Sequence, residues 1–274
     1  MINKADYDLV GAYSQDEING LTDALLEKMI DLIDPQHAIK ILEAMGGDGN
    51  FLLRLFNYCK NRNIEPPHCT LFELSKIQTK FAREKLPTEK FDVICGDILT
   101  LISSDEGKRL EKGVYDRVII KSSNHEIPLE CQQIFYQHIF ELLQPGGYFI
   151  NLGFLFNNQN ERDEVRKLAA VKDELAGMKQ AQKNRYFMMR DELYKCLEAA
   201  GFINIQAKIN FDYHILSKIV AEYYFDKNIR DDLNIKNQAA QIYSVALRRN
   251  ERIQFIKDES LLILPGEITI AYKP

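Results

Sequence analysis

The spacing of apolar residues changes along the chain, and the change separates predicted helices from predicted strands. Over residues 1–36 apolar positions recur on one helix face, and Pro35 ends the pattern. Short, nearly continuous apolar runs then alternate with further helical patterns. The runs predict five strands, at residues 38–45, 68–73, 91–95, 115–120 and 148–152. This alternation is typical of βαβ units, in which helices cover both faces of a parallel sheet.

The rest of the chain has longer helical patterns and fewer strands. Residues 158–190 are polar with nearly balanced charges, which predicts a solvated helix of mixed charge. A helix over residues 191–200 should end at Gly201, because glycine readily takes the left-handed conformation beyond a helix end. The pattern then predicts a sixth strand over 202–211, mostly helical structure over 215–255, and a last strand or hairpin over 261–272.

Composition narrows the class of protein. The 274 residues are 46% hydrophobic and 27% charged, with a net charge of −5, as in an ordinary globular protein. No apolar run reaches membrane-spanning length, and the start lacks the apolar core of a secretory signal. The slight acidity argues against duplex nucleic acid as a partner. Five scattered cysteines without C-x-x-C spacing favour a reducing cytoplasm over a disulfide framework or a zinc ribbon.

A glycine-rich turn follows the first predicted strand. Glu43 stands near the end of that strand, and Gly46, Gly47 and Gly49 come next. Glycines allow a backbone to approach a ligand closely, and the following helix offers free N–H groups. A turn that merely tightens the chain is the alternative. Leu52 stands where the dinucleotide fingerprint requires its last glycine, and no Gly-Lys-Ser/Thr follows, so a pyrophosphate ligand is disfavoured.

Two more acids stand where the next two strands end. Glu73 ends the second strand, where its carboxylate could accept both hydroxyls of a ribose. Asp97 follows the third strand and precedes a predicted helix, where it could bind an adenine amino group while Ile98 covers the purine. Each acid alone could equally be a helix N-cap or a solvated residue. Three acids at the ends of successive parallel strands favour a nucleoside ligand that lacks phosphate.

This constellation resembles the class I S-adenosylmethionine (SAM)-dependent methyltransferases. Their first motif, acid-x-Gly-x-Gly-x-Gly, lines up with Glu43 to Gly49, except that Met45 replaces the first glycine. Glu73 matches the ribose-binding acid, and Gly96-Asp97-Ile98 matches the adenine-binding segment. Weaker similarities follow in the family's order, at Tyr115-Asp116, Pro145-Gly146-Gly147, Arg185-Tyr-Phe187, Asp191-Glu-Leu and Ala199-Ala-Gly201-Phe202.

The resemblance implies a doubly wound α/β fold, with a seven-stranded, mostly parallel sheet and helical lid elements. It divides the chain into a helical lid segment at 1–35, a SAM-binding core at 36–213, a helical insert at 214–258 and a final strand at 259–274. It implies methyl transfer from SAM to a small-molecule acceptor, with S-adenosylhomocysteine (SAH) as product. The implied cofactor residues are Glu43, Met45, Gly46, Gly47, Gly49, Glu73, Leu74, Gly96, Asp97, Ile98 and Asn124.

The acceptor side is expected beyond the fourth strand. His125 is the candidate general base, since its unperturbed pKa of about 6.5 suits proton transfer at neutral pH. Capping the next helix, or packing, is the alternative role for His125. The residues expected to face the acceptor are Tyr13, Asn151, Phe154 and His214. Lid aromatics are expected at Tyr7, Tyr223, Tyr224 and Phe225, and a small basic cluster at Arg248, Arg249 and Arg252.

Other readings stay open at this point. No cluster of metal ligands is evident in the sequence, so metal-independent transfer is expected. The acceptor could instead be a macromolecule, either RNA or protein. The chain could also be a fold relative that binds SAM without transferring a methyl group. A homodimer is possible, because the lid aromatics could form an interface. An NAD-dependent dehydrogenase is disfavoured by the glycine spacing.

Overall fold

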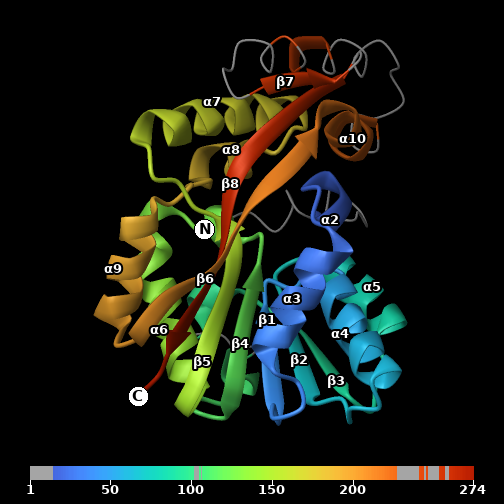
Figure 1. The fold of residues 1–274 in the computed structure, drawn as a ribbon, viewed down its shortest axis with the longest axis vertical. Coiled ribbons are helices and arrows are strands. Elements are labelled where there is room, and N and C mark those ends of the chain that lie inside the picture. The colour runs from blue at the N-terminus through green and yellow to red at the C-terminus, as the bar shows by residue number, and fades with distance from the viewer. Residues whose placement is uncertain are drawn as a thin grey trace.

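The central sheet has the predicted α/β topology, in a computed structural model that describes residues 15–101, 105, 107–226, 241–243, 245, 253–256 and 259–274. Seven strands follow the order β3-β2-β1-β4-β5-β8-β6, and β7 pairs with β8 (Figure 1). Strands β1 to β5 are parallel, and β8 is antiparallel to β5 and β6. The doubly wound, mostly parallel sheet is therefore confirmed. The strands are β1 Lys40–Ala44, β2 His68–Glu73, β3 Phe91–Cys95, β4 Tyr115–Lys121, β5 Leu143–Phe154, β6 Ile203–Leu216, β7 Ile253–Ile256 and β8 Glu259–Tyr272.

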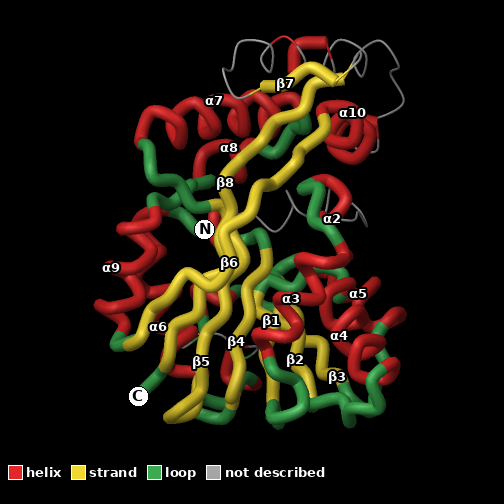
Figure 2. The backbone as a smooth tube through the Cα atoms, in the orientation of Figure 1, coloured by secondary structure: helices red, strands yellow, loops and turns green. Residues whose placement is uncertain are grey.

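Alternating residues of each inner strand pack into two separate cores, one on each face of the sheet. In β1, Ile41 joins the first core and Leu42 the second. The first core includes residues of α3, α4 and α5, and the second includes residues of α6 and α9 (Figure 2). The main helices are α3 Asp23–Ile33, α4 Asn50–Asn61, α5 Lys76–Lys85, α6 Gln132–Leu142, α7 Gln159–Leu175, α8 Lys179–Asn184 and α9 Arg190–Ala200. No described helix has both the length and the apolarity that a membrane crossing needs.

The described part of the N-terminal segment forms two helices. One packs into the core, and the other lies near the carboxyl ends of the strands. Helix α3 starts after Thr22, whose hydroxyl accepts from the Leu25 N–H, and its Ile30 is fully buried in the first core. The Tyr148 hydroxyl donates to the Leu32 carbonyl at 2.8 Å. Helix α3 is thus held to the sheet, contrary to the expectation of a lid there. The shorter α2 (Gln15–Ile18) lies towards the carboxyl ends of the strands.

The last part of the sheet extends well beyond the others. Strands β6 and β8 are each 14 residues long, and α7, α8, α10 (Ser217–Val220) and β7 lie around their far ends (Figure 1). The expectation of mostly helical structure over 215–255 is confirmed for most of its described residues, which are helical at 217–226, 241–243 and 245. It is wrong at the two ends of the range, because β6 continues to Leu216 and β7 is a strand. The basic cluster Arg248, Arg249 and Arg252 lies outside the described residues, as do Tyr7 and Tyr13.

Several predicted boundaries also move. Of the helix expected after Asp97, the described residues form a 3₁₀ turn at Ile98–Thr100, and residues 102–104 lie outside the described part of the chain. Strand β5 begins at Leu143 instead of residue 148. The 158–190 segment forms two helices, α7 and α8, separated at Gly177, whose φ is 72°. Helix α9 ends at Gly201 with a φ of 103°, as the sequence predicts.

Helix α3 should unfold only with the core. We expect Ile30→Ala to lower the free energy of unfolding by about 2–5 kcal/mol, since it leaves a cavity in a packed interior. Urea unfolding followed by circular dichroism measures this change. Lys28→Ala, on the exposed face of the same helix, is the control and should change stability little. An Ile30→Ala variant as stable as the parent would show that α3 is a detachable lid.

Candidate functional site

The turn after β1 has the backbone conformation that glycines normally supply. Gly47 and Gly49 have φ values of 57° and 79°, and Met45 also lies in the left-handed region, with φ 59°. A positive φ is uncommon for a residue with a side chain and is concentrated at functional sites. The Met45 N–H donates to the Phe72 carbonyl at 2.7 Å. Met45 therefore stands where the methyltransferase motif has its first glycine, and its backbone still has the left-handed conformation that glycine adopts easily.

Glu73 fastens this turn to the end of β2. One carboxylate oxygen accepts from the Gly47 N–H at 3.0 Å, and the other accepts from the Ser75 N–H at 2.8 Å. The residue is buried, yet it lines the cavity beside the turn. Each carboxylate oxygen has two lone pairs, so both can accept further hydrogen bonds. Glu73 thus stabilises the turn, and its carboxylate also faces the cavity beside it.

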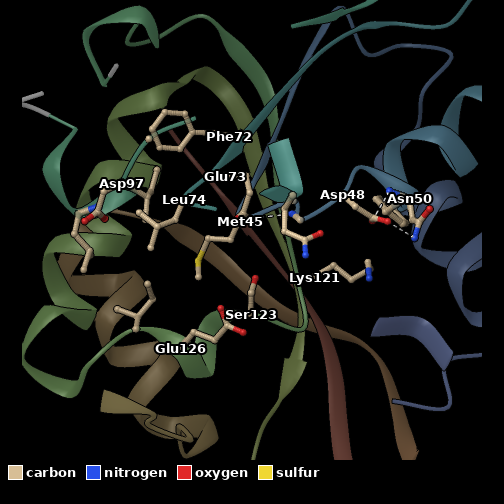
Figure 3. Close-up of a pocket in the computed structure, with 18 of the residues that line it drawn as sticks. Met45, Asp48, Asn50, Phe72, Glu73, Leu74, Asp97, Lys121, Ser123 and Glu126 are labelled. Carbon is tan, nitrogen blue, oxygen red and sulfur yellow. Dashed lines mark hydrogen bonds between the residues drawn. The ribbon is translucent and has the colours of Figure 1, made fainter. Parts of the chain in front are cut away.

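A first cavity opens at the carboxyl ends of β1 to β4, with about 950 Å³ of space not filled by protein atoms, part of it open to solvent. Asp97 lies towards one end and Asp48 towards the other, with Met45 between them (Figure 3). The Asp97 carboxylate accepts from the Leu99 N–H at 3.0 Å, so it also caps the 3₁₀ turn. Eight predicted cofactor residues line this cavity: Met45, Gly46, Gly47, Glu73, Leu74, Gly96, Asp97 and Ile98.

Three predicted cofactor residues lie behind the cavity wall. Gly49 begins α4, where a Cβ would come within 2.9 Å of a Leu86 methyl carbon. Asn124 is fully buried, with its amide against Gly153 of β5. Glu43 is buried beneath Gly46, and its Oε2 has no hydrogen-bond partner among the described residues. Burial raises the pKa of Glu43 to about 8, although Lys121 acts in the opposite direction.

A buried ion pair that the sequence did not indicate closes one side of the first cavity. The Lys121 Nζ, at the end of β4, lies 2.5 Å from an Asp16 carboxylate oxygen of α2, and both residues line the cavity. The only sequence signal for Lys121 is its place directly after the apolar run of the fourth strand. Nothing in the sequence pairs it with a residue more than a hundred positions earlier.

A second cavity adjoins the first, with about 680 Å³ of space not filled by protein atoms, part of it open to solvent. Glu126, in the 3₁₀ turn Asn124–Glu126, lines both cavities, and Figure 3 shows it beside Ser123 in the wall of the first. His125 and Phe154, which were assigned to the acceptor side from the sequence, both line the second cavity. Among the other candidates, Asn151 is buried within β5, and His214 is exposed on β6, since the neighbouring Tyr213 faces inward. Neither lines a described cavity.

The His125 imidazole lies between aromatic rings at the second cavity. It stacks parallel to Phe187, with ring centroids 5.1 Å apart, and meets the Phe154 ring edge-on at 5.2 Å. Its Nδ1 has no hydrogen-bond partner among the described residues. Burial, followed by the positive charges of Arg185 and Lys172, holds the pKa of His125 well below its ordinary value. The ring is therefore neutral at pH 7 and only weakly basic.

Those two cations belong to a buried cluster around Asp173. The fully buried Asp173 carboxylate accepts from the Arg185 Nε at 2.7 Å and pairs with the Lys172 Nζ at 2.8 Å. Its pKa is about 2, because the two cations outweigh the effect of burial. Lys172 and Arg185 both line the second cavity. The expectation of a wholly solvated helix over 158–190 is thus wrong at this end of α7, where the charges pair inward.

Similarity to known proteins lies in the fold alone. No family model matches the sequence, and no curated protein matches it. The YcgJ protein from Bacillus subtilis superimposes with a TM-score of 0.68 and 11% identity, over 90% of this chain and 97% of that one. The geranyl diphosphate C-methyltransferase of Streptomyces coelicolor, solved with Mg²⁺, geranyl diphosphate and SAH, has a TM-score of 0.53 at 11% identity, over 100% and 88%.

This is the fold of the class I SAM-dependent methyltransferases. The neighbours in structure are nearly all enzymes of that type. One is named for a different reaction: the [4+2]-cyclase SpnF has a TM-score of 0.56 at 16% identity, over 90% of this chain and 81% of that one. The methyltransferase fold therefore leaves the reaction of this chain to be decided by its own residues.

The buried Glu43 should make stability depend on pH. Its raised pKa means that the folded state holds a proton that the unfolded chain loses above about pH 4.5. Glu43 therefore costs stability progressively as pH rises from about 5 to 8. Glu43→Gln should gain stability relative to the parent over that range, by at most about 1.4 kcal/mol per pH unit. Urea unfolding of both proteins at pH 5, 6, 7 and 8 measures the difference; a difference independent of pH would contradict the assignment.

Proposed function

We propose that this chain is a SAM-dependent methyltransferase whose acceptor is a small molecule. The observation that carries the proposal is the pair of adjoining cavities with Glu126 in the wall of both. The first is lined by acids and glycine-turn backbone at the carboxyl ends of parallel strands, where ligands of such sheets bind. The second is mostly apolar and adjoins the first, as a site for the methyl acceptor must.

The hydrogen-bonding groups and the charges of the first cavity support SAM as its ligand. Glu73 suits the ribose hydroxyls, Asp97 the adenine amino group, and Ile98 a face of the purine. Within the described part of the chain, five carboxylate residues and one lysine line this cavity: Asp16, Asp48, Glu73, Asp97, Glu126 and Lys121. SAM carries a positive sulfonium and a positive ammonium group, so an excess of carboxylates favours it over an anionic nucleotide.

The protein's part in the reaction is to bind, orient and exclude water. SAM supplies a methyl group that is already activated by a positively charged sulfur. The chain must then hold an acceptor atom close to that methyl group and keep water away. Glu126 lies at the junction of the two cavities, where the acceptor atom and the methyl group would come together. Within the second cavity, Phe154 and Phe187 surround His125 with apolar surface. A large macromolecular acceptor fits this second cavity poorly, because its walls are mostly buried side chains.

A second candidate is a SAM-binding enzyme that does not transfer a methyl group. The similarity to the [4+2]-cyclase SpnF supports it, because a protein of this fold can carry another reaction. Methyl-labelled SAM, incubated with the protein and a small-molecule metabolite extract, separates the candidates. The proposal predicts label in a product of low mass. Label in RNA or protein would contradict the small acceptor, and cofactor binding without any transfer would favour the second candidate.

The cofactor residues can be tested by binding alone. We expect Glu73→Gln and Asp97→Asn each to weaken SAH binding by about tenfold, the cost of losing one hydrogen bond to a charged group. Isothermal titration calorimetry measures the dissociation constants. Glu84→Gln on the exposed side of α5 is a matched control and should bind as the parent does. Unchanged affinity in both site variants would refute the assignment of this cavity to the nucleoside.

A further inference from the structure

The second cavity selects its occupant first by shape. Its walls include the aromatic residues Phe154, Phe187, Tyr224 and Tyr243, together with aliphatic side chains such as Leu168 and Leu264. The Phe154 ring also stacks on the buried Tyr213, with centroids 3.9 Å apart, so its position is fixed by packing. Apolar and aromatic walls of this kind favour a largely apolar molecule with flat faces.

The wall of this cavity contains a polar ring, the imidazole of His125, that can hydrogen-bond with a ligand. The neutral His125 imidazole has one nitrogen that donates and one that accepts. Its Nδ1 is buried without a partner among the described residues, so it is the other ring nitrogen that an occupant of the cavity can reach. A polar atom left unpaired beside an apolar ligand is costly, so an occupant that hydrogen-bonds with that nitrogen is favoured over a hydrocarbon.

The charges beside His125 determine whether a ligand group bound next to the ring is favoured as an anion or as a cation. Lys172 and Arg185 line the cavity, and the one carboxylate that acts on the His125 imidazole with them is Asp173. The cluster of Lys172, Arg185 and Asp173 therefore carries one surplus positive charge beside the ring, which favours an anion there and repels an ammonium group. Glu126 is the one acid among the described residues that line this cavity, and it also faces the first cavity, where SAM would place its positive sulfur.

We propose that the second cavity takes a planar, mostly apolar acceptor bearing an acidic hydroxyl, a phenol or an enol, and that methyl transfer is to its oxygen. This inference rests on the proposed function. His125 is a weak base, so it can accept a proton only from an acidic group, which a simple alcohol is not. Lys172 and Arg185 stabilise the anion that remains.

The step balances without any further reagent. The hydroxyl proton moves first to the unprotonated nitrogen of His125, and a lone pair of the oxyanion that remains then forms the new bond to the methyl carbon. The carbon–sulfur bond breaks, and its electron pair stays on sulfur, which becomes an uncharged thioether. The imidazolium of His125 then loses its proton to water, which its low pKa makes easy.

A matched set of probes tests the inference: 4-nitrophenol, 4-nitrothiophenol and 4-nitroaniline, each added to the protein saturated with SAH. The visible absorption of 4-nitrophenol reports its ionisation. We expect it to bind as the phenolate, with an apparent pKa at least one unit below that of the free compound, and 4-nitroaniline to bind at least tenfold more weakly. With SAM and the corresponding naphthalene compounds, 2-naphthol should be methylated faster than 2-naphthalenethiol or 2-naphthylamine.

Two variants locate the effect in the cavity. Lys172→Gln should remove most of the shift in the phenol's pKa, and Lys172→Arg should keep it, while SAH affinity stays the same. Lys167→Gln, an exposed lysine on the same helix, is the control and should leave the shift unchanged. If Lys172→Gln does not fold, Leu168→Trp, which fills the cavity from α7, should abolish phenol binding while preserving SAH binding.

The outcomes separate this inference from the proposed function. A protein that binds SAH but binds no phenol, binds it only in the neutral form, or binds 4-nitroaniline equally well overturns the inference and leaves the proposed function standing. Faster methylation of the thiol or the amine overturns the assignment to oxygen. A protein that binds neither SAH nor SAM overturns the proposed function itself.

Discussion

The geometry of the candidate site depends on one buried carboxylate, that of Glu73. It accepts the Gly47 N–H from the turn after β1 and the Ser75 N–H from its own strand end, so it joins two neighbouring strands at their carboxyl ends. This connection fixes the left-handed turn at Met45 and Gly47 and with it one wall of the first cavity. In a parallel sheet the carboxyl ends of the strands lie at one edge. Glu73 fixes the positions of the chain segments that leave two of these strands, and so it fixes the cavity wall that they form.

The two cavities differ in charge, and the difference divides the chemistry between them. Carboxylates outnumber cations in the lining of the first, whereas the Lys172–Arg185–Asp173 cluster beside His125 in the second has one surplus positive charge. A cationic methyl donor and an anionic acceptor would each be stabilised on its own side and attracted towards the other at Glu126. The extended ends of β6 and β8 make this arrangement possible, because α7 and α10 lie around them beyond the main sheet.

Sequence patterns predict the parts of this fold that local forces decide. Strands β2 and β3 lie at their predicted residues, since each is a continuous apolar run between turn signals. Strand β7 was missed because its pairing with β8 is a tertiary contact that leaves no local period. The burial of Asp173 was missed for the same reason: a carboxylate between Lys172 and Arg185 looks like a solvated charge until α7 packs inward. His125 and Phe154 were placed at the acceptor side because their strands end there, whereas the outward direction of His214 depends on the register of β6.

The central claim is that the nucleoside of the cofactor occupies the first cavity and that its sulfur faces the second. A crystal structure of the complex with SAH tests it most directly. We expect the ribose hydroxyls within hydrogen-bond distance of the Glu73 carboxylate and the adenine beside Asp97 and Ile98. The sulfur should lie at the junction of the two cavities, near Glu126. SAH bound elsewhere, or bound with its sulfur turned away from the cavity that contains His125, would contradict the account.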